Sequence, residues 1–316
     1  MNRAAILLAG VLFVAMIAVA PAAVFLDQPY LLILFQKMAI YALAAVGLNI
    51  VLGLGGLPAF GHAAFLGIGA YTVGIAAAET AGAGPFASGW VQFPLAAVVA
   101  GLAGALFGSI ALRTRGVAFL MITLAFGQML YYAAVALERY GGDDGMPIAT
   151  PTHLGSFALT RGVGTYALAV GLLMLALYFA FRLSRSPFGY VLQGAAKNER
   201  RMEAIGVSVF RYRVAAFALS GAVCGLAGAL LANHSAFVSP ATVSWTRSVE
   251  LAVMVLLGGA GTVFGPLFGA GAFVLLEEVL SGATEHWRIV FGPLLLLIVL
   301  AAPGGIAGLL QRPKGK

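Results

Sequence analysis

Long apolar stretches alternate with short polar segments along almost the whole chain. The hydrocarbon core of a bilayer is roughly 30 Å thick, so a helix needs about 20 apolar residues to cross it. Stretches near this length occupy residues 4–26, 30–52, 57–78, 91–112, 116–137, 164–181, 214–233 and 289–310. The pattern predicts an all-α polytopic membrane protein.

A further apolar stretch, residues 249–280, is too long for one span and short for two. Glycines interrupt it, and irregular backbone at membrane depth is tolerated only where it is buried in protein or lines a polar cavity. We therefore expect two short spans or a re-entrant pair here, and about ten transmembrane or re-entrant helices in all. The interrupting residues that we assign to a translocation pathway are Gly258, Gly259, Gly261, Gly265 and Pro266.

The composition excludes a soluble globular protein. Hydrophobic residues make up 61% of the chain and charged residues only 9%, whereas soluble domains carry roughly 45–50% and about 25%. The single cysteine, Cys224, excludes a disulfide framework and a multi-cysteine metal site. We expect one transmembrane domain over residues 1–316, with one long loop at 182–213.

The basic residues predict the orientation, because cytoplasmic loops carry an excess of Lys and Arg. In the orientation that this rule favours, 13 of the 18 basic residues and both termini lie in the cytoplasm. With this orientation, residues 249–280 must enter and leave the membrane on the outer face. The first stretch, 4–26, resembles a signal peptide with Ala18-Val19-Ala20 as its cleavage site, but its apolar run continues beyond that site to Leu26 and favours an uncleaved span. The basic residues on the cytoplasmic side are Arg3, Arg113, Arg115, Arg182, Arg185, Lys197, Arg200, Arg201, Arg211, Arg213, Arg312, Lys314 and Lys316.

A weak internal repeat is found when the sequence is aligned with itself so that Val51 matches Val255. Transporters often carry glycine-interrupted segments at matching positions of two repeats, near the substrate path. The residues Val51, Leu52, Gly55, Phe60, Gly61 and Gly67 then fall on Val255, Leu256, Gly259, Phe264, Gly265 and Gly271.

The loop at 182–213 contains seven of the 18 basic residues and predicts a helix. Ser186 and Pro187 are typical of its first positions, and Gly206 of its end. In an unbroken helix, Glu199 falls within an apolar face that ends at Ile205, so it requires a cationic or hydrogen-bonding partner in this chain or in another protein. The helix either rests on anionic lipid or docks to a cytoplasmic protein, and Glu199 favours docking.

Few side chains could carry chemistry. No nucleotide-binding G-x-x-x-x-G-K-[ST] sequence is present, and the histidines lie too far apart in the sequence for metal-ligand spacing. We therefore expect neither an enzyme nor a cofactor. His62, the one intramembrane histidine, is expected to bond a backbone carbonyl or to act as a gate, and Asn49 to tie helices together. Lys37 can reach outward to Asp27, and the lack of other buried charges argues against an ion-driven carrier.

Several motifs together resemble one family. They are residues 47–53 and 60–71, Gly141-Gly142-Asp143-Asp144-Gly145, Ser186-Pro187-Phe188-Gly189, residues 198–206, and residues 257–262 with Gly265-Pro266. This set is similar to the permease subunits of ABC importers for branched-chain amino acids, and to the M-type subunit rather than its H-type partner. Related permeases move urea, short amides and other amino acids, so these remain alternative substrates.

The resemblance implies an assembly in the cytoplasmic (inner) membrane. Two ATP-binding cassette subunits would drive a pair of homologous permeases, and an extracytoplasmic solute-binding protein would deliver the amino acid. The long loop would be the coupling helix, although Tyr190 and Gly194 depart from the family pattern. The ATPase contact would comprise Ser186, Pro187, Gly189, Asn198, Glu199, Arg200, Glu203 and Gly206, and the pathway would also include Asn49, Gly61 and His62. Asp143 and Asp144 would form a tight outer turn or contact the binding protein.

Overall fold

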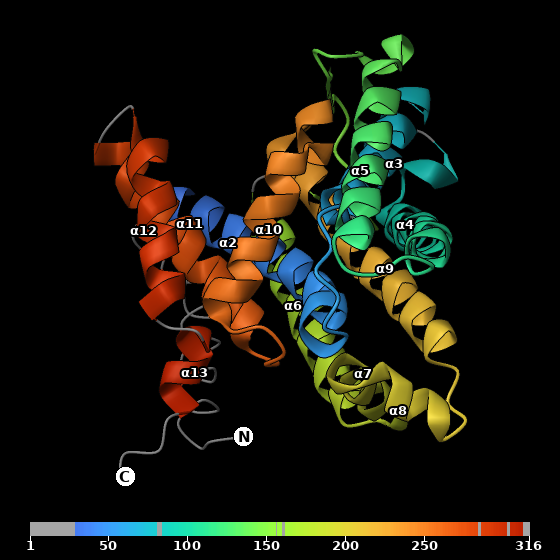
Figure 1. The fold of residues 1–316 in the computed structure, drawn as a ribbon. Helices are drawn as coiled ribbons and strands as arrows, with labels where there is room; N and C mark the ends of the chain where they lie inside the picture. The colour runs from blue at the N-terminus through green and yellow to red at the C-terminus, as the bar shows by residue number, and fades with distance from the viewer. Residues whose placement is uncertain are drawn as a thin grey trace.

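Helices dominate the computed structural model, which describes residues 29–80, 84–155, 157–159, 162–283, 286–301 and 304–311 (Figure 1). Seven helical segments among these residues are long and apolar enough to cross a bilayer. They are α2 (Pro29–Asn49) with its π-helical continuation η1 (Ile50–Leu54), α3 (His62–Thr80), α4 (Gly89–Ala111), α5 (Val117–Val135), α6 (Val163–Ser184), α9 (Val209–Ser235) and α11 (Gly265–Ala283).

Shorter elements connect these helices. The short helices are α7 (Pro187–Lys197), α8 (Glu199–Ala204), α10 (Trp245–Gly258), α12 (Trp287–Ala301) and α13 (Gly305–Gln311), with 3-10 turns η2 (Pro85–Ala87), η3 (Glu138–Tyr140) and η4 (Pro240–Val243). The strands are β1 (Met146–Pro147), β2 (His153–Leu154), β3 (Phe157–Ala158) and β4 (Phe237–Val238). They form two antiparallel pairs, β1 with β4 and β2 with β3.

The connections gather at two ends of the molecule. At one end, which we call the basic end, Glu199 of α8 pairs with Arg115 of the α4–α5 turn and with Arg213 near the start of α9. At the opposite end, Glu79 of α3 pairs with Arg139 of η3. Figure 1 shows α7, α8 and α13 at one end of the bundle and the loop after α5 at the other. The sequence-predicted grouping of these loops is therefore confirmed for the described residues.

The expected number of about ten helices is not confirmed, because seven helical segments of the described residues are long and apolar enough to cross a bilayer. The stretch 4–26 lies outside the described residues, so its two interpretations stay untested. α10 has 14 residues, about 21 Å at 1.5 Å per residue, which is less than a bilayer core. The stretch 289–310 is not one helix either, because α12 ends at Ala301 and α13 starts at Gly305, whose φ of 65° does not continue a helix.

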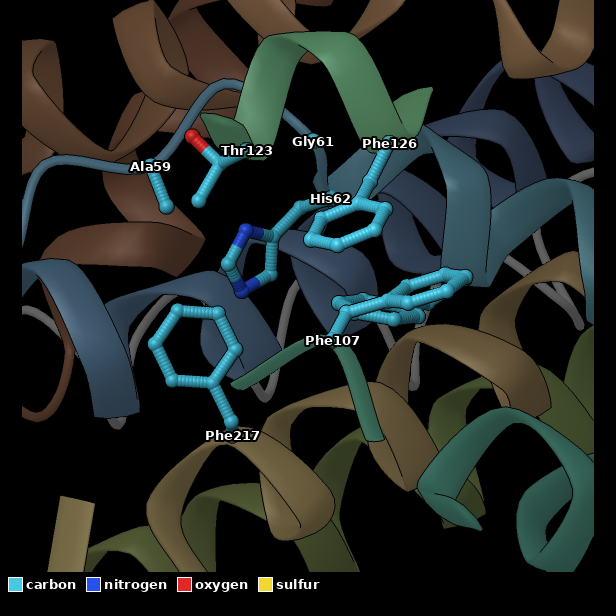
Figure 2. Close-up of a pocket in the computed structure, with 8 residues that line it drawn as sticks. Ala59, Gly61, His62, Phe107, Thr123, Phe126 and Phe217 are labelled. Atoms are coloured by element: carbon cyan, nitrogen blue, oxygen red, sulfur yellow. The ribbon is translucent and has the colours of Figure 1, made fainter. Parts of the chain in front are cut away.

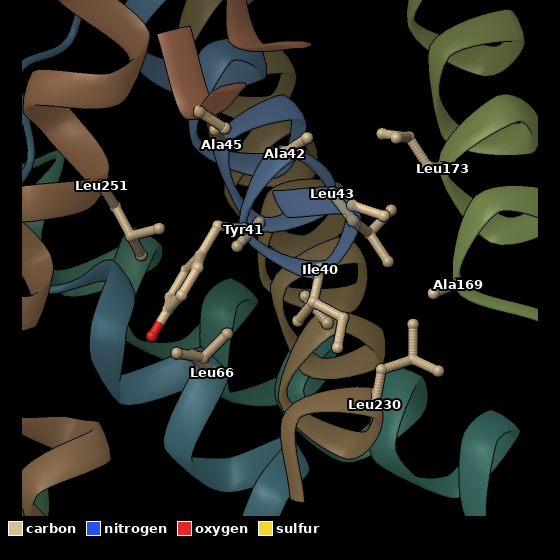
Figure 3. Packing of buried hydrophobic residues seen from close by; sticks show 14 of the residues in the cluster. Ile40, Tyr41, Ala42, Leu43, Ala45, Leu66, Ala169, Leu173, Leu230 and Leu251 are labelled. Atoms are coloured by element: carbon tan, nitrogen blue, oxygen red, sulfur yellow. The ribbon is translucent and has the colours of Figure 1, made fainter. Parts of the chain in front are cut away.

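α2 lies at the centre of the helix packing. Figure 3 shows its residues Ile40 and Leu43 on the side of Leu230 of α9 and Leu173 of α6, whereas Tyr41 points toward Leu66 and Leu251. All of these side chains are buried. Because several other helices cover α2, little of its surface is exposed. α2 is therefore the central helix against which the others pack.

Glycines allow α9 to approach its neighbours closely. A Cβ at Gly228 of α9 would overlap the carbonyl oxygen of Leu66 on α3, and a Cβ at Gly69 of α3 would overlap that of Gly225. Small residues at helix interfaces let backbones come into contact in this way. The high glycine content of the sequence is therefore used for close helix packing.

The positions of two pairs of helices agree with the internal repeat. The helical segment before the first break ends at Leu54, and the helix before the second break ends at Gly258. The two end residues are separated by the same sequence offset as Val51 and Val255. The helix after each break begins at His62 and at Gly265, which differs from this offset by a single position. In each pair, the first helix runs toward the basic end and the second helix returns to the opposite end. The first break lies at the basic end, because Gly56 lies against Ala196 of α7. The start of α2 and the end of α11 lie together at the opposite end, where Tyr30 donates a hydrogen bond to Glu278.

Candidate functional site

The two glycine breaks meet in space, and Asn49 joins them. Its Oδ1 accepts the backbone N–H of Gly261 at 2.9 Å, and its Nδ2 donates to the carbonyl of Thr262 at 2.9 Å. Asn49 is buried at the end of α2, and a buried backbone N–H or carbonyl requires a partner. The expectation that Asn49 ties helical segments together is therefore confirmed.

The glycines of the second break are required by their contacts and backbone angles. A Cβ at Gly258 would overlap the carbonyl oxygen of Gly265, so α10 and α11 cross in direct backbone contact. Gly259 and Gly261 have φ values of 109° and 78°, a region that side chains rarely adopt. Pro266, which has no N–H to donate, is buried in the first turn of α11. The structure thus brings these four predicted residues and Gly265 together with Asn49.

Gly61 and His62 lie at the start of α3, close to α5 and α9. Gly61 is buried, and a Cβ there would overlap the carbonyl oxygen of Thr123. His62 is 1% exposed and its Nε2 lies 3.0 Å from Oγ of Ser220. The Ser220 hydroxyl donates to the carbonyl of Gly47 at 2.6 Å, so it accepts from His62, and Nε2 carries the proton. The predicted bond to a backbone carbonyl is wrong, because the serine hydroxyl lies between the two groups.

The second ring nitrogen of His62 faces an aromatic pocket. Nδ1 is buried and has no hydrogen-bond partner among the described residues. Figure 2 shows one ring nitrogen on the side of Phe217 and the other on the side of Ala59 and Thr123. The pocket has a volume of about 10 Å³, which is close to the space of one water molecule. It is lined by Ala59, Gly61, His62, Phe65, Phe107, Thr123, Phe126 and Phe217.

The start of the helix expected in the 182–213 loop agrees with the prediction. Ser186 is the N-cap of α7, and its Oγ accepts the N–H of Gly189 at 3.2 Å while its hydroxyl donates to Leu183 at 2.7 Å. Pro187 occupies the first helical position. Gly189 is buried, and a Cβ there would overlap the carbonyl oxygen of Leu183. The three residues together fold α7 back against the end of α6.

The helix does not continue unbroken to Gly206. Asn198 has an extended backbone, with φ −158° and ψ 96°, and its Oδ1 caps the N–H of Arg201 at 3.0 Å. α7 therefore ends at Lys197, and the separate helix α8 ends at Ala204, before the positive φ of 85° at Gly206. The break changes the orientation of the later residues. Ile205, expected on the buried face, is 69% exposed.

Glu199 finds its cationic partners within the chain. Its carboxylate lies 2.9 Å from Arg213 and 3.2 Å from Arg115, and the Arg213 side chain is only 12% exposed. Glu199 therefore joins α8 to the start of α9 and to the α4–α5 turn. The requirement for a partner is confirmed, but this carboxylate no longer favours docking over lipid contact. The exposed groups on the same helices include Arg200 and Glu203.

Asp143 and Asp144 lie in an exposed turn at the opposite end. The turn contains Gly141, Gly142 and Gly145, all with positive φ, so the expected tight turn is confirmed. Tyr140, which precedes this turn in sequence, donates a hydrogen bond to Glu79 at 2.7 Å. This hydrogen bond, with some desolvation, raises the pKa of the Tyr140 hydroxyl.

Sequence reasoning missed the groups that connect these segments. Lys37 pairs with Glu277 at 3.0 Å, a partner that the sequence did not indicate, and the expected contact with Asp27 lies outside the described residues. Ser220 holds His62, and Arg213 holds Glu199. A serine in an apolar helix and an arginine in a basic loop have no periodicity or spacing that identifies a partner, so only tertiary structure could pair them.

Comparison with known proteins shows one family. Residues 30–300 match the model of the branched-chain amino acid transport system / permease component family. The chain is 31% identical over 291 residues to the high-affinity branched-chain amino acid transport system permease protein LivM of Escherichia coli K12, covering 84% of this chain and 67% of LivM. It is 28% identical over 232 residues to the autoinducer 2 import system permease protein LsrC of Salmonella paratyphi B, covering 69% of this chain and 64% of LsrC. No solved structure gives a significant match. The chain therefore belongs to the family of permease components of branched-chain amino acid transport systems.

Proposed function

We propose that this chain is a permease subunit of an ABC importer for branched-chain or related amino acids. It would form the translocation pathway with a homologous H-type permease, receive substrate from an extracytoplasmic binding protein, and be driven by two separate ATPase subunits. The observation that carries the proposal is the family match over residues 30–300, together with a helix pair that projects from the basic end of the bundle.

The helix pair α7–α8 is the surface we propose for the ATPase contact. Tyr190 and Ile205 expose 64% and 69% of their surface, and Lys197, Arg200 and Glu203 are exposed charged residues of the same segment. An apolar centre with a charged rim is typical of protein interfaces. Glu199 would act differently, because its two ion pairs fix α8 to the membrane helices and would transmit a movement of α8 to α5 and α9.

The pathway is proposed along the joined glycine breaks and the His62 pocket. Asn49 and the backbone contacts of Gly258 and Gly265 hold two pairs of helices together without large side chains. His62 offers a hydrogen-bond acceptor, Nδ1, to the aromatic pocket. The pocket is almost filled in this conformation, so substrate would enter only after the surrounding helices separate.

Reconstitution tests the transport function. The chain, its companion permease, the ATPases and the binding protein are placed in proteoliposomes, and ATP-dependent uptake of leucine is compared with that of urea and a short amide. Uptake of leucine supports the proposal. Uptake of urea without leucine would change the substrate and leave the ABC permease assignment. Accumulation by this chain alone, without ATPases, would overturn the assignment.

The proposed contact surface requires a separate measurement. Tyr190→Ala with Ile205→Ala should reduce binding of the ATPases and the stimulation of their activity, because both side chains are largely exposed and available to a partner. Tyr132→Ala is the matched control, since Tyr132 exposes 67% of its surface on α5. Equal ATPase binding by both variants would argue against this surface.

Orientation is proposed from the basic residues, with the basic end and both termini in the cytoplasm. The single cysteine, Cys224, is fully buried, so an introduced cysteine can be labelled against a low background. Asp144→Cys should react with a membrane-impermeant thiol reagent in intact cells, and Arg201→Cys only after permeabilisation. The reverse pattern would contradict the proposed orientation.

A further inference from the structure

An apolar groove runs along one face of α6. It has a volume of about 480 Å³ and is lined by α6 together with Leu43 of α2 and Val223 and Leu226 of α9. The α6 residues that line it extend from Leu172 to Arg182. The ten helical steps from Leu172 to Arg182 span about 15 Å, which is half of a bilayer core of roughly 30 Å. The groove therefore has the length of one membrane leaflet and ends at an arginine.

A basic pocket of about 510 Å³ continues from the arginine end of this groove. The two cavities share Phe179 and Arg182, and the second also contains Arg185, Ser186 and Pro187. The Arg185 guanidinium carbon lies 4.2 Å from the ring centre of Phe181, which holds this side chain near the end of α6. The positive N-terminal end of α7, at Ser186 and Pro187, faces the same pocket.

The structure shows no counter-charge for these two arginines among the residues it describes. Neither Arg182 nor Arg185 pairs with a carboxylate within the part of the chain that the structure describes. By contrast, Arg115 and Arg213 at the same end share Glu199. The pocket therefore presents two positive charges that an external anion can neutralise, directly beside an apolar surface of one leaflet's length.

We propose that the groove and the basic pocket together bind one anionic phospholipid. The phosphate would lie between Arg182 and Arg185, and an acyl chain would lie in the groove against α6. Basic pockets between membrane helices are suited to anionic headgroups, and the apolar groove distinguishes a lipid from a soluble phosphate. The bound lipid would bridge the last turn of α6 and the first turn of α7, so it would set the position of the α7–α8 pair. The binding itself does not depend on the proposed transport function.

Native mass spectrometry of the purified full-length chain tests the site. The chain in detergent is titrated with phosphatidylglycerol and, in parallel, with the zwitterionic phosphatidylethanolamine. One phosphatidylglycerol should remain bound preferentially. The double variant Arg182→Gln with Arg185→Gln should bind it about thirty-fold more weakly, which corresponds to ~2 kcal/mol for two basic residues near the headgroup. The double variant Arg113→Gln with Arg211→Gln, which removes two other exposed arginines at the basic end, should bind normally.

Four further results would overturn the proposal. Equal retention of the two lipids would remove the role of the headgroup charge. Displacement of phosphatidylglycerol by glycerol 3-phosphate would show that only the basic pocket binds, as it would for a soluble phosphate. Binding that occurs only after deletion of residues 1–28, or that disappears in the complex with a second permease, would show that protein covers the groove. The glycerol 3-phosphate titration uses the unmodified chain, so it decides the question even if the arginine variants do not fold.

Discussion

The side chain of Asn49 and the backbone of Gly261 are joined by a hydrogen bond of 2.9 Å across 212 residues of sequence. The same amide donates to Thr262, so one side chain satisfies an N–H and a carbonyl of the loop between α10 and α11. A Cβ at Gly53 would overlap the N–H of Gly261. The end of α2 and this loop therefore form one packed unit.

Replacing Asn49 should separate this unit. Asn49→Leu keeps a similar volume but leaves the N–H of Gly261 and the carbonyl of Thr262 without partners. We expect a loss of about 1–3 kcal/mol in the free energy of unfolding, measured by thermal unfolding in detergent, and a loss of transport in the reconstituted complex. Asn233→Leu is the matched control, since Asn233 is equally buried at 4% exposure but donates only to Ala229 of its own helix. Similar losses in both variants would contradict the special role of Asn49.

Because α10 and α11 are in direct backbone contact at Gly258, we predict that even a methyl group is too large at this position. Gly258→Ala should destabilise the protein by about 1–3 kcal/mol, because the added Cβ overlaps the backbone of Gly265. Gly171→Ala in α6 should be neutral or stabilising by up to about 1 kcal/mol, since a Cβ there meets nothing within 4 Å. Thermal unfolding of the two variants checks the difference. A Gly258→Ala protein as stable as the unmodified chain would show that α10 and α11 are not in backbone contact.

The ion pairs of Glu199 predict a charge-swap experiment. Glu199→Lys should lower the melting temperature and loosen α8, because the mostly buried Arg213 would then face a like charge. Combining Glu199→Lys with Arg213→Glu should recover part of the loss. The pair with Arg115, which is 69% exposed, should contribute little, so Arg115→Gln is expected to cost less than about 1 kcal/mol. No recovery in the double variant would argue against a direct Glu199–Arg213 interaction.

The hydrogen bond from Tyr140 to Glu79 predicts a pH effect at the opposite end. The raised pKa of Tyr140 means that the unfolded chain loses this proton at a lower pH than the folded chain. Its stabilising effect is therefore complete below the ordinary tyrosine pKa of about 10 and is lost as pH rises through the folded-state pKa. Tyr140→Phe should remove this alkaline loss of stability, and Glu79→Gln should lower the pKa of Tyr140 in a spectrophotometric titration. An unchanged titration in Glu79→Gln would contradict the interaction.

Much of the local structure could be predicted from the chain. Ser186 and Pro187 begin a helix as expected, because an N-cap hydroxyl and a proline at the first position act within one turn. The glycine interruption of 249–280 is likewise a local property, since Gly259 and Gly261 adopt angles that other residues rarely reach. The continuous helix to Gly206 was wrong, although Asn198 is itself a residue that favours N-caps. Helical periodicity alone does not show whether such a residue caps a new helix.

The sequence by itself predicted a helical membrane protein from its apolar stretches, the glycine interruption of 249–280 and, from its basic residues, which loops share an end, because each depends on the solvent preference or backbone freedom of neighbouring residues. Only the tertiary structure decided that Asn49 holds Gly261, that His62 bonds Ser220 and that Glu199 pairs with Arg213. These contacts join residues that lie far apart in sequence. Their partners are fixed by how glycine-lined helices pack, and that geometry has no local signal in the chain.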